Sequence, residues 1–199
     1  MQKILNSKYA FGLFIVLIAA LLIHSCADRV SDHDRGLREL ENGNLHEAIT
    51  FFTSSIDKNE NVVSSYNHRG LSYLYLGDME LSLDDFADAL ELEEDPIVYH
   101  NRALVYKELG HPESAFADLD MAGRLNETDL ELFLSTGYAM LELGYLEQSE
   151  SLFTKAIDAF PDSMEAFNGR GNARIEMSDI AGAEADWDKA VQISAAGRN

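Results

Sequence analysis

Apolar and small side chains recur along this sequence every three or four residues, which places them on one face of a helix. The stretch 63–95 contains two such stripes, one on each side of Gly77, and the first consists of Tyr66, Gly70 and Tyr73. The second stripe consists of Ser82, Phe86 and Ala89. No stretch of the sequence alternates apolar and polar residues with the period of two that marks a strand. The pattern therefore predicts an all-α fold in which pairs of helices of about 13 residues meet at a glycine turn.

The same pair of stripes returns along the chain at a nearly constant interval. The positions equivalent to Gly70 in the five copies are Gly36, Gly70, Ala103, Gly137 and Gly171. The steps between them are 33 or 34 residues, which is the period of stacked helical hairpins. We therefore expect a repeat domain over 32–197, with units at about 29–62, 63–95, 96–129, 130–163 and 164–197. In the first unit Asp32 stands where the second has Tyr66, so its first helix is expected to be a polar terminal cap.

The second unit has the form Tyr-Asn-x-Arg-Gly at 66–70 and Asp-Phe-x-x-Ala at 85–89. This form resembles one subgroup of the tetratricopeptide repeats, and the resemblance covers residues 29–197. It implies a right-handed α-solenoid of five helix-turn-helix repeats, with a concave groove lined by the first helices. Because these repeats serve many unrelated partners, the resemblance predicts protein binding without naming the partner.

An arginine and an aspartate change together between the copies. Arg69 precedes the glycine of the second unit, and Asp85 lies just before the large residue of its second helix. The equivalent pairs are Arg102 with Asp118 in the third unit and Arg170 with Asp186 in the fifth. In the fourth unit both positions differ, because Thr136 and Leu152 stand there. We therefore predict three structural ion pairs, each joining the two helices of one hairpin.

The N-terminal residues differ from the repeats. An apolar run from Phe11 to Ile23 follows a basic start. It has the length found in secretory signals and is shorter than the roughly 20 residues of a membrane-spanning helix. The run ends in Ile-His-Ser-Cys at 23–26, which resembles the lipobox of bacterial lipoproteins. Cys26, the only cysteine, is therefore expected to be lipidated after a signal peptide at 1–25 is removed, so that its acyl chains anchor the protein. The alternatives are an ordinary signal peptide or an uncleaved anchor helix.

Residues 26–31 would then form a short tether between the lipidated cysteine and the repeats. Because an extended chain spans about 3.5 Å per residue, the tether keeps the repeats within a few nanometres of the membrane. Ala27 follows the cysteine. In enteric lipoproteins an aspartate at that place retains the protein at the inner membrane. By resemblance to them, the alanine predicts the outer membrane, at its periplasmic face or at the cell surface.

The sequence is strongly acidic, with a formal net charge of −20. Removal of residues 1–25 would take away Lys3 and Lys8 and no acidic residue, which would make the charge more negative. Such a surface repels the phosphates of nucleic acids, so nucleic acid is not an expected partner. Solvated helices also commonly carry many acidic residues, so the charge alone does not describe a partner.

The sequence contains no arrangement typical of a catalytic or metal site. It has no phosphate-binding glycine loop and no nucleophile at a familiar spacing from a base, so we expect no enzyme activity, cofactor or metal. Of the six histidines, His68 and His100 occupy first helices of adjacent units and could approach each other, as a solvated or hydrogen-bonded pair. A metal would need a third ligand there. The histidines at 33, 46 and 111 are expected in polar, turn-like or capping positions.

The concave groove is the remaining candidate site, by resemblance to the family. Residues beside the buried stripe of each first helix are expected to face it. They are Asn67, Leu71, Leu74, Tyr75, His100, Leu104, Lys107, Glu108, Leu134, Tyr138, Leu141, Glu142, Asn168, Asn172, Ile175 and Glu176. Amides of this set can pair with a peptide backbone, and tyrosine offers contact area at a low entropic cost. Lys107 is the only cation among them, so a clamp for the terminal carboxylate of a peptide is not expected.

Together these features predict a membrane-anchored scaffold or adaptor of the bacterial cell envelope, which binds a peptide or helix of another envelope protein in its groove. The alternative function is a module that binds a small ligand or carbohydrate through its groove tyrosines and asparagines. No further polar helix follows the last hairpin in this sequence, so that end is a candidate surface for a homodimer.

Overall fold

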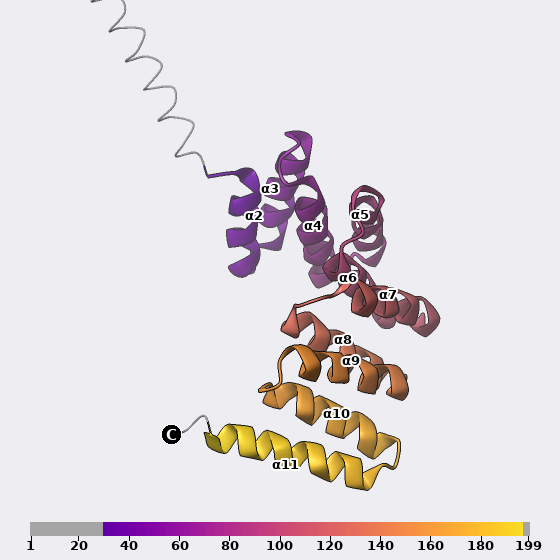
Figure 1. Ribbon diagram of the computed structural model, residues 1–199. Helices are drawn as coiled ribbons and strands as arrows, with labels where there is room; N and C mark the ends of the chain where they lie inside the picture. The colour runs from indigo at the N-terminus through magenta and orange to yellow at the C-terminus, as the bar shows by residue number, and fades with distance from the viewer. Residues whose placement is uncertain (1–29, 197–199) are drawn as a thin grey trace, which may run out of the picture.

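The computed structural model describes residues 30–196, and this part of the chain is almost entirely α-helical (Figure 1). Its helices are α2 (Asp32–Glu41), α3 (Leu45–Asp57), α4 (Val62–Leu76), α5 (Met79–Leu92), α6 (Pro96–Glu108), α7 (Pro112–Leu125), α8 (Leu130–Glu142), α9 (Leu146–Ala159), α10 (Met164–Glu176) and α11 (Ile180–Ala196). Because no strand occurs among the described residues, the predicted all-α fold is confirmed. None of the helices within 30–196 is long and apolar enough to cross a membrane. The predicted signal segment and Cys26 lie outside the described residues.

Consecutive helices pack as five hairpins, which stack one after another along a curved array (Figure 1). Each first helix among α2, α4, α6, α8 and α10 contacts the first helix of the next hairpin. Within the described chain, no second helix makes a comparable contact with the next second helix. Neighbouring hairpins therefore lie closer together at their first helices than at their second helices. The array curves toward the first helices, which line its concave side.

Close packing inside four of the five hairpins depends on a glycine of the first helix, and the third hairpin has Ala103 there. A Cβ atom added at Gly70 would lie 2.9 Å from the ring of Phe86, a side chain that is fully buried. Beside this contact, the Ser82 hydroxyl donates to the Gly70 carbonyl oxygen at 2.8 Å. Ser149 and Gly137 repeat the same hydrogen bond in the fourth hairpin, also at 2.8 Å. A small residue opposite a glycine thus brings the two helix backbones together over a large buried side chain.

The hairpin turns require a left-handed backbone conformation, and four of the five place glycine there. These residues are Gly43, Gly77, Gly110 and Gly144, with φ angles of 78°, 86°, 74° and 82°. The fifth turn has Ser178 at the equivalent position, with φ of 66°. For a residue with a Cβ atom this conformation costs about 1–2 kcal/mol.

Replacing Ser178 by glycine is expected to raise the free energy of unfolding by about 0.5–1 kcal/mol. The relief of left-handed strain exceeds the extra entropy that a glycine loses on folding, which is about 0.5–1 kcal/mol. Urea denaturation would measure the change. The matched control is Ser151→Gly inside α9, where the backbone is helical and the same substitution should destabilise the protein by a few tenths of a kcal/mol up to about 1. A Ser178→Gly variant that is less stable than the wild type would contradict the strain argument.

Candidate functional site: the concave groove

Three arginine–aspartate pairs join the helices of the second, third and fifth hairpins. Arg69 donates from Nε and Nη2 to the two carboxylate oxygens of Asp85, at 2.8 and 2.7 Å. The other pairs are Arg102 with Asp118, at 2.8 and 2.8 Å, and Arg170 with Asp186, at 2.9 and 2.7 Å. All three aspartates are buried. The three ion pairs predicted from the sequence are therefore confirmed. Their charged groups hold the two helices of a hairpin together.

Two of these arginines also reach the preceding hairpin. Arg69 donates from Nη1 to the Thr53 hydroxyl at 2.9 Å, and Arg170 donates in the same way to Thr154 at 3.4 Å. In the first hairpin, Phe51 takes the place of the aspartate. There the guanidinium of Arg35 lies 5.9 Å from the centre of the Phe51 ring, within the range of a cation–π contact.

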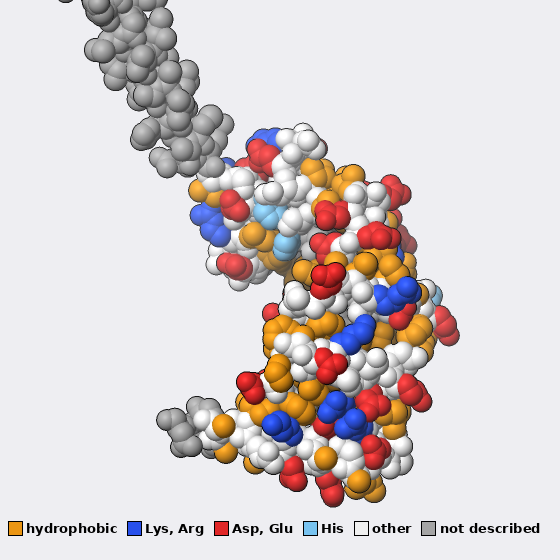
Figure 2. All heavy atoms as spheres, viewed as in Figure 1, with side chains coloured by type: hydrophobic (Ala, Val, Ile, Leu, Met, Phe, Trp, Pro, Cys, Tyr) orange, Lys and Arg blue, Asp and Glu red, His pale blue; other side chains and the backbone are white. Residues whose placement is uncertain are grey.

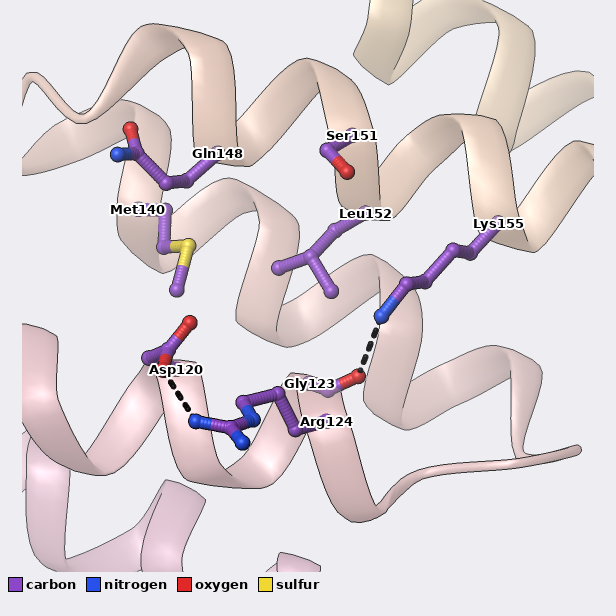
Figure 3. A pocket seen from close by; sticks show the side chains of 8 residues that line it. All are labelled: Asp120, Gly123, Arg124, Met140, Gln148, Ser151, Leu152 and Lys155. Atoms are coloured by element: carbon purple, nitrogen blue, oxygen red, sulfur yellow. Dashed lines mark hydrogen bonds and ion pairs between the residues drawn. The ribbon is translucent and has the colours of Figure 1, made fainter.

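The fourth hairpin, which lacks the pair, meets the third hairpin in a different way (Figure 3). Leu152 lies against Gly123 of α7, where an added Cβ atom would be 2.5 Å from the Leu152 Cδ2 atom. The other four units have a large aliphatic residue at this position, namely Ile56, Leu90, Ile157 and Val191. Lys155 donates to the Gly123 carbonyl oxygen at 3.1 Å. A shallow pocket opens beside these residues, but Leu152 and Met140 at its base are buried, so we attribute it to packing.

Two of the predicted groove residues, Asn67 and His100, make hydrogen bonds to the next hairpin. Asn67 is only 7% exposed, and its side-chain oxygen accepts from the Asn101 amide at 2.9 Å. His100 is 9% exposed, and its Nδ1 lies 3.0 Å from the Thr136 hydroxyl oxygen. Burial lowers the pKa of His100 to about 4, and the charge of Lys107 acts in the same direction. These two side chains tie neighbouring first helices together, which corrects their assignment to the binding surface.

The predicted approach of His68 to His100 is replaced by a contact between His33 and His68. Their ring centres are 5.5 Å apart, and His68 stacks on Phe52 at 5.6 Å. His33 is buried, with Nδ1 2.9 Å from the Ser65 hydroxyl oxygen. Burial lowers the pKa of both histidines. The first helix is polar, as expected, and His33 has polar partners, but the expectation of a turn-like His33 is wrong, because the residue lies inside the helix and is buried against the second hairpin.

Asp32, at the start of the same helix, is also buried. Its carboxylate accepts from Lys58 and from the Ser54 hydroxyl of α3. These hydrogen bonds lower the pKa of Asp32. Asp32 stands where the second unit has Tyr66, and its hydrogen bonds connect the start of the first helix to the end of the second helix in the first hairpin.

The remaining predicted residues of the N-terminal and central groove divide by exposure. Leu71, Leu74 and Leu134 are half-buried and pack against core side chains, and Leu104 is half-buried as well. Tyr75 is 65% exposed. Lys107, half-buried, donates to Glu142 of the next hairpin at 2.8 Å, so its charge is already paired.

The asparagine side chains of the predicted groove that remain open to a ligand lie in its C-terminal half, on α10. Asn168 and Asn172 are exposed, and no hydrogen bond to the described chain occupies their amides. Tyr138 of α8 is half-buried, with its ring edge-on to Phe153 at 4.9 Å, and burial raises its pKa. A hollow at the C-terminal ends of α8 and α10 is lined by Leu141, Gly144, Leu146, Asn172, Ile175 and Glu176. Figure 2 shows the molecule hollowed on its concave side, with hydrophobic side chains along the edge.

The chemistry available in this half is recognition through hydrogen bonds and apolar contact. No group of three or more histidine, cysteine, aspartate or glutamate side chains gathers within 30–196 in a way suited to a metal ion. An asparagine amide both donates and accepts, so Asn168 and Asn172 can pair with a peptide backbone in either direction. The groove is thus suited to holding a chain segment.

Comparison with known proteins agrees with this architecture. Tetratricopeptide repeat family models match residues 63–96 and 134–198. Tetratricopeptide repeat protein 6 from Homo sapiens is 29% identical over 175 residues, covering 82% of this chain and 34% of that protein. Serine/threonine-protein phosphatase T from Trypanosoma brucei brucei is 30% identical over 86 residues, covering 43% of this chain and 18% of the relative. This chain therefore spans about a third of the first relative and less than a fifth of the second.

Solved structures show the same fold at low sequence identity. YrrB, described as a tetratricopeptide repeat protein with an unusual peptide-binding site, superposes with a TM-score of 0.61 at 21% identity, over 88% of this chain and 91% of its own. MamA superposes with a TM-score of 0.65 at 16% identity, over 82% of this chain and 96% of its own. The molecule is an α-solenoid of helical hairpins with a concave groove. It contains tetratricopeptide repeats, as the family models show, and their fold supports protein–protein interaction scaffolds.

Proposed function

We propose that this protein is an adaptor that binds an extended segment or a helix of a partner protein in the C-terminal half of its concave groove. The observation that carries the proposal is the contrast between the two halves of the groove. In the N-terminal half Asn67 and His100 are buried in hydrogen bonds between hairpins. In the C-terminal half Asn168 and Asn172 are exposed, and Asn172 lines an apolar hollow. Polar groups placed around an apolar depression are the usual composition of a binding site.

We further propose that the adaptor works in the bacterial cell envelope, anchored at the outer membrane through acyl chains on Cys26. The support is the apolar run that ends in Ile-His-Ser-Cys and the alanine at 27. Its partners would then be other envelope proteins. Metabolic labelling with palmitate tests the anchor, because label on the wild type should disappear in a Cys26→Ser variant, and an unlabelled wild type would refute it.

Site-specific photocrosslinking tests the groove. A benzoylphenylalanine in place of Asn172, in the full chain expressed in its own bacterium, is expected to crosslink to a specific partner protein. The same amino acid in place of Glu184, an exposed residue of α11, is the matched control and should not trap that partner. No specific product at position 172, or the same products at both positions, would rule out the groove as the binding site.

A further inference from the structure

We infer that the segment bound in the C-terminal half of the groove is extended and basic, with an aliphatic side chain beside its lysine or arginine residues. This inference rests on the proposed function, because it names the chemistry of the partner that the groove receives. It is carried by the apolar hollow between α8 and α10 and by the charges along its edge.

A glutamate ends the first helix in four of the five hairpins. These residues are Glu41, Glu108, Glu142 and Glu176, and the second hairpin has Tyr75 at the equivalent position. All four glutamates are exposed. A negative charge at the C-terminal end of a helix is unfavourable, because the helix dipole already places partial negative charge there. Helix stability therefore does not explain this column of acids along the groove.

The column is largely free to receive a cation. Lys107 pairs with Glu142 at 2.8 Å, across adjacent hairpins. Within 30–196, no lysine or arginine lies at ion-pair distance from Glu108 or Glu176. The pairing at Glu142 also shows that a lysine side chain lying across the first helices can reach a member of the column. A basic segment from another protein would offer the same contact to the unpaired glutamates.

The hollow indicates that the bound segment also has an apolar side chain next to its basic residues. Leu141 and Leu146 line it from the fourth hairpin, and Ile175, which is 37% exposed, lines it from the fifth. Glu176 lines the same hollow next to Ile175. An aliphatic side chain that enters the hollow would therefore place the neighbouring residues of its own chain close to a carboxylate.

The spacing of the column fits an extended chain. Helices packed side by side lie about 8–10 Å apart, and consecutive first helices of the array are in contact. An extended chain in the polyproline II conformation has three residues per turn and rises about 3.1 Å per residue. Every third side chain therefore lies on one face, about 9 Å from the last, so basic residues at every third position would meet successive glutamates. The net charge of −20 would attract such a segment and repel an acidic one.

Fluorescence anisotropy with two labelled peptides tests this inference. The first peptide is Lys-Ser-Leu-Lys-Ser-Ser-Lys, and the second has glutamate in place of each lysine. The lysine peptide is expected to bind, and to bind more weakly as salt is added. A single Glu176→Gln substitution should weaken binding about threefold, within the range of an exposed ion pair. Adding Glu108→Gln should bring the loss to about tenfold, because well-separated sites act nearly additively.

Matched variants separate the groove from general attraction to an acidic protein. Glu184→Gln on α11 removes the same charge away from the hollow and should leave binding unchanged. Ile175→Ser keeps every charge and should weaken binding by removing the apolar contact. Equal binding of both peptides, no binding of either, or equal losses for Glu176→Gln and Glu184→Gln would overturn the inference.

The crosslinking experiment keeps this inference distinct from the proposed function. A partner trapped at position 172 through a neutral or acidic segment would refute the basic character of the ligand and leave the adaptor function standing. Failure to trap any specific partner there would refute the adaptor function, whatever the peptides show.

Discussion

Replacing Arg102 by leucine is expected to lower the free energy of unfolding by about 3–5 kcal/mol. Arg102 makes two hydrogen bonds of 2.8 Å to Asp118, whose side chain is only 8% exposed. Removing one partner of a buried ion pair leaves the other charge without compensation, which costs far more than the intact pair contributes. Urea denaturation of the variant and the wild type at pH 7 would measure the loss.

Arg170→Leu is the matched control, because the fifth hairpin has a second cation. Arg174 donates from Nη1 to Asp186 at 2.8 Å and from Nε to Glu150 of the fourth hairpin at 2.7 Å. Asp186 therefore keeps a charged donor when Arg170 is removed, and the loss of stability should be clearly smaller than for Arg102→Leu. Equal losses in the two variants, or an Arg102→Leu protein as stable as the wild type, would contradict the uncompensated-charge argument.

Acidification is expected to destabilise the protein through His100. Burial lowers the pKa of His100 from 6.5 to about 4, so the unfolded chain binds a proton at a pH where the folded protein does not. The stability that the neutral His100 ring contributes is fully present above pH 6.5 and is lost as the pH falls through 4. Each pKa unit corresponds to 1.36 kcal/mol. The total loss is therefore about 3 kcal/mol, of which about 2 should appear between pH 7 and pH 5.

A His100→Asn variant isolates this effect. Asparagine keeps a group that can bond Thr136 but does not titrate, so the difference in stability between pH 7 and pH 5 should shrink by about 2 kcal/mol. His33 and His68 also have lowered pKa values, so part of the acid sensitivity should remain. His111→Asn, at an exposed position, is the control and should retain the wild-type difference. An unchanged difference in His100→Asn would show that the ring is not kept neutral by burial.

Much of the hairpin architecture follows from local comparison of the copies. Arg69 and Asp85 lie within one hairpin, and the joint change to Thr136 and Leu152 in the fourth unit indicates that the two positions touch. Contacts of this kind recur at one sequence separation, so five copies supply repeated evidence for them. The contact between Gly123 and Leu152, in contrast, joins two neighbouring units. A signal was present in the sequence, since four other units have a large aliphatic residue there.

The groove was less predictable than the hairpins. A helical pattern indicates which side of a first helix faces the concave surface, but not whether a polar side chain there reaches the next helix. Asn67 and Asn168 occupy equivalent positions in their units, yet Asn67 bonds Asn101 and is buried, whereas Asn168 is exposed. The partner at the adjacent unit decides the outcome, and that partner differs from one copy to the next.

The sequence by itself determined the repeat, the helix pairs, the glycine turns and the three ion pairs, because each depends on neighbours at a constant distance along the chain. Only the tertiary structure decided which groove residues are open. The distance and angle between successive hairpins bring His33 to His68 and His100 to Thr136, and they leave Asn172 beside an apolar hollow. Those distances arise from side-chain packing at each joint, which differs among the joints and is not encoded in the period.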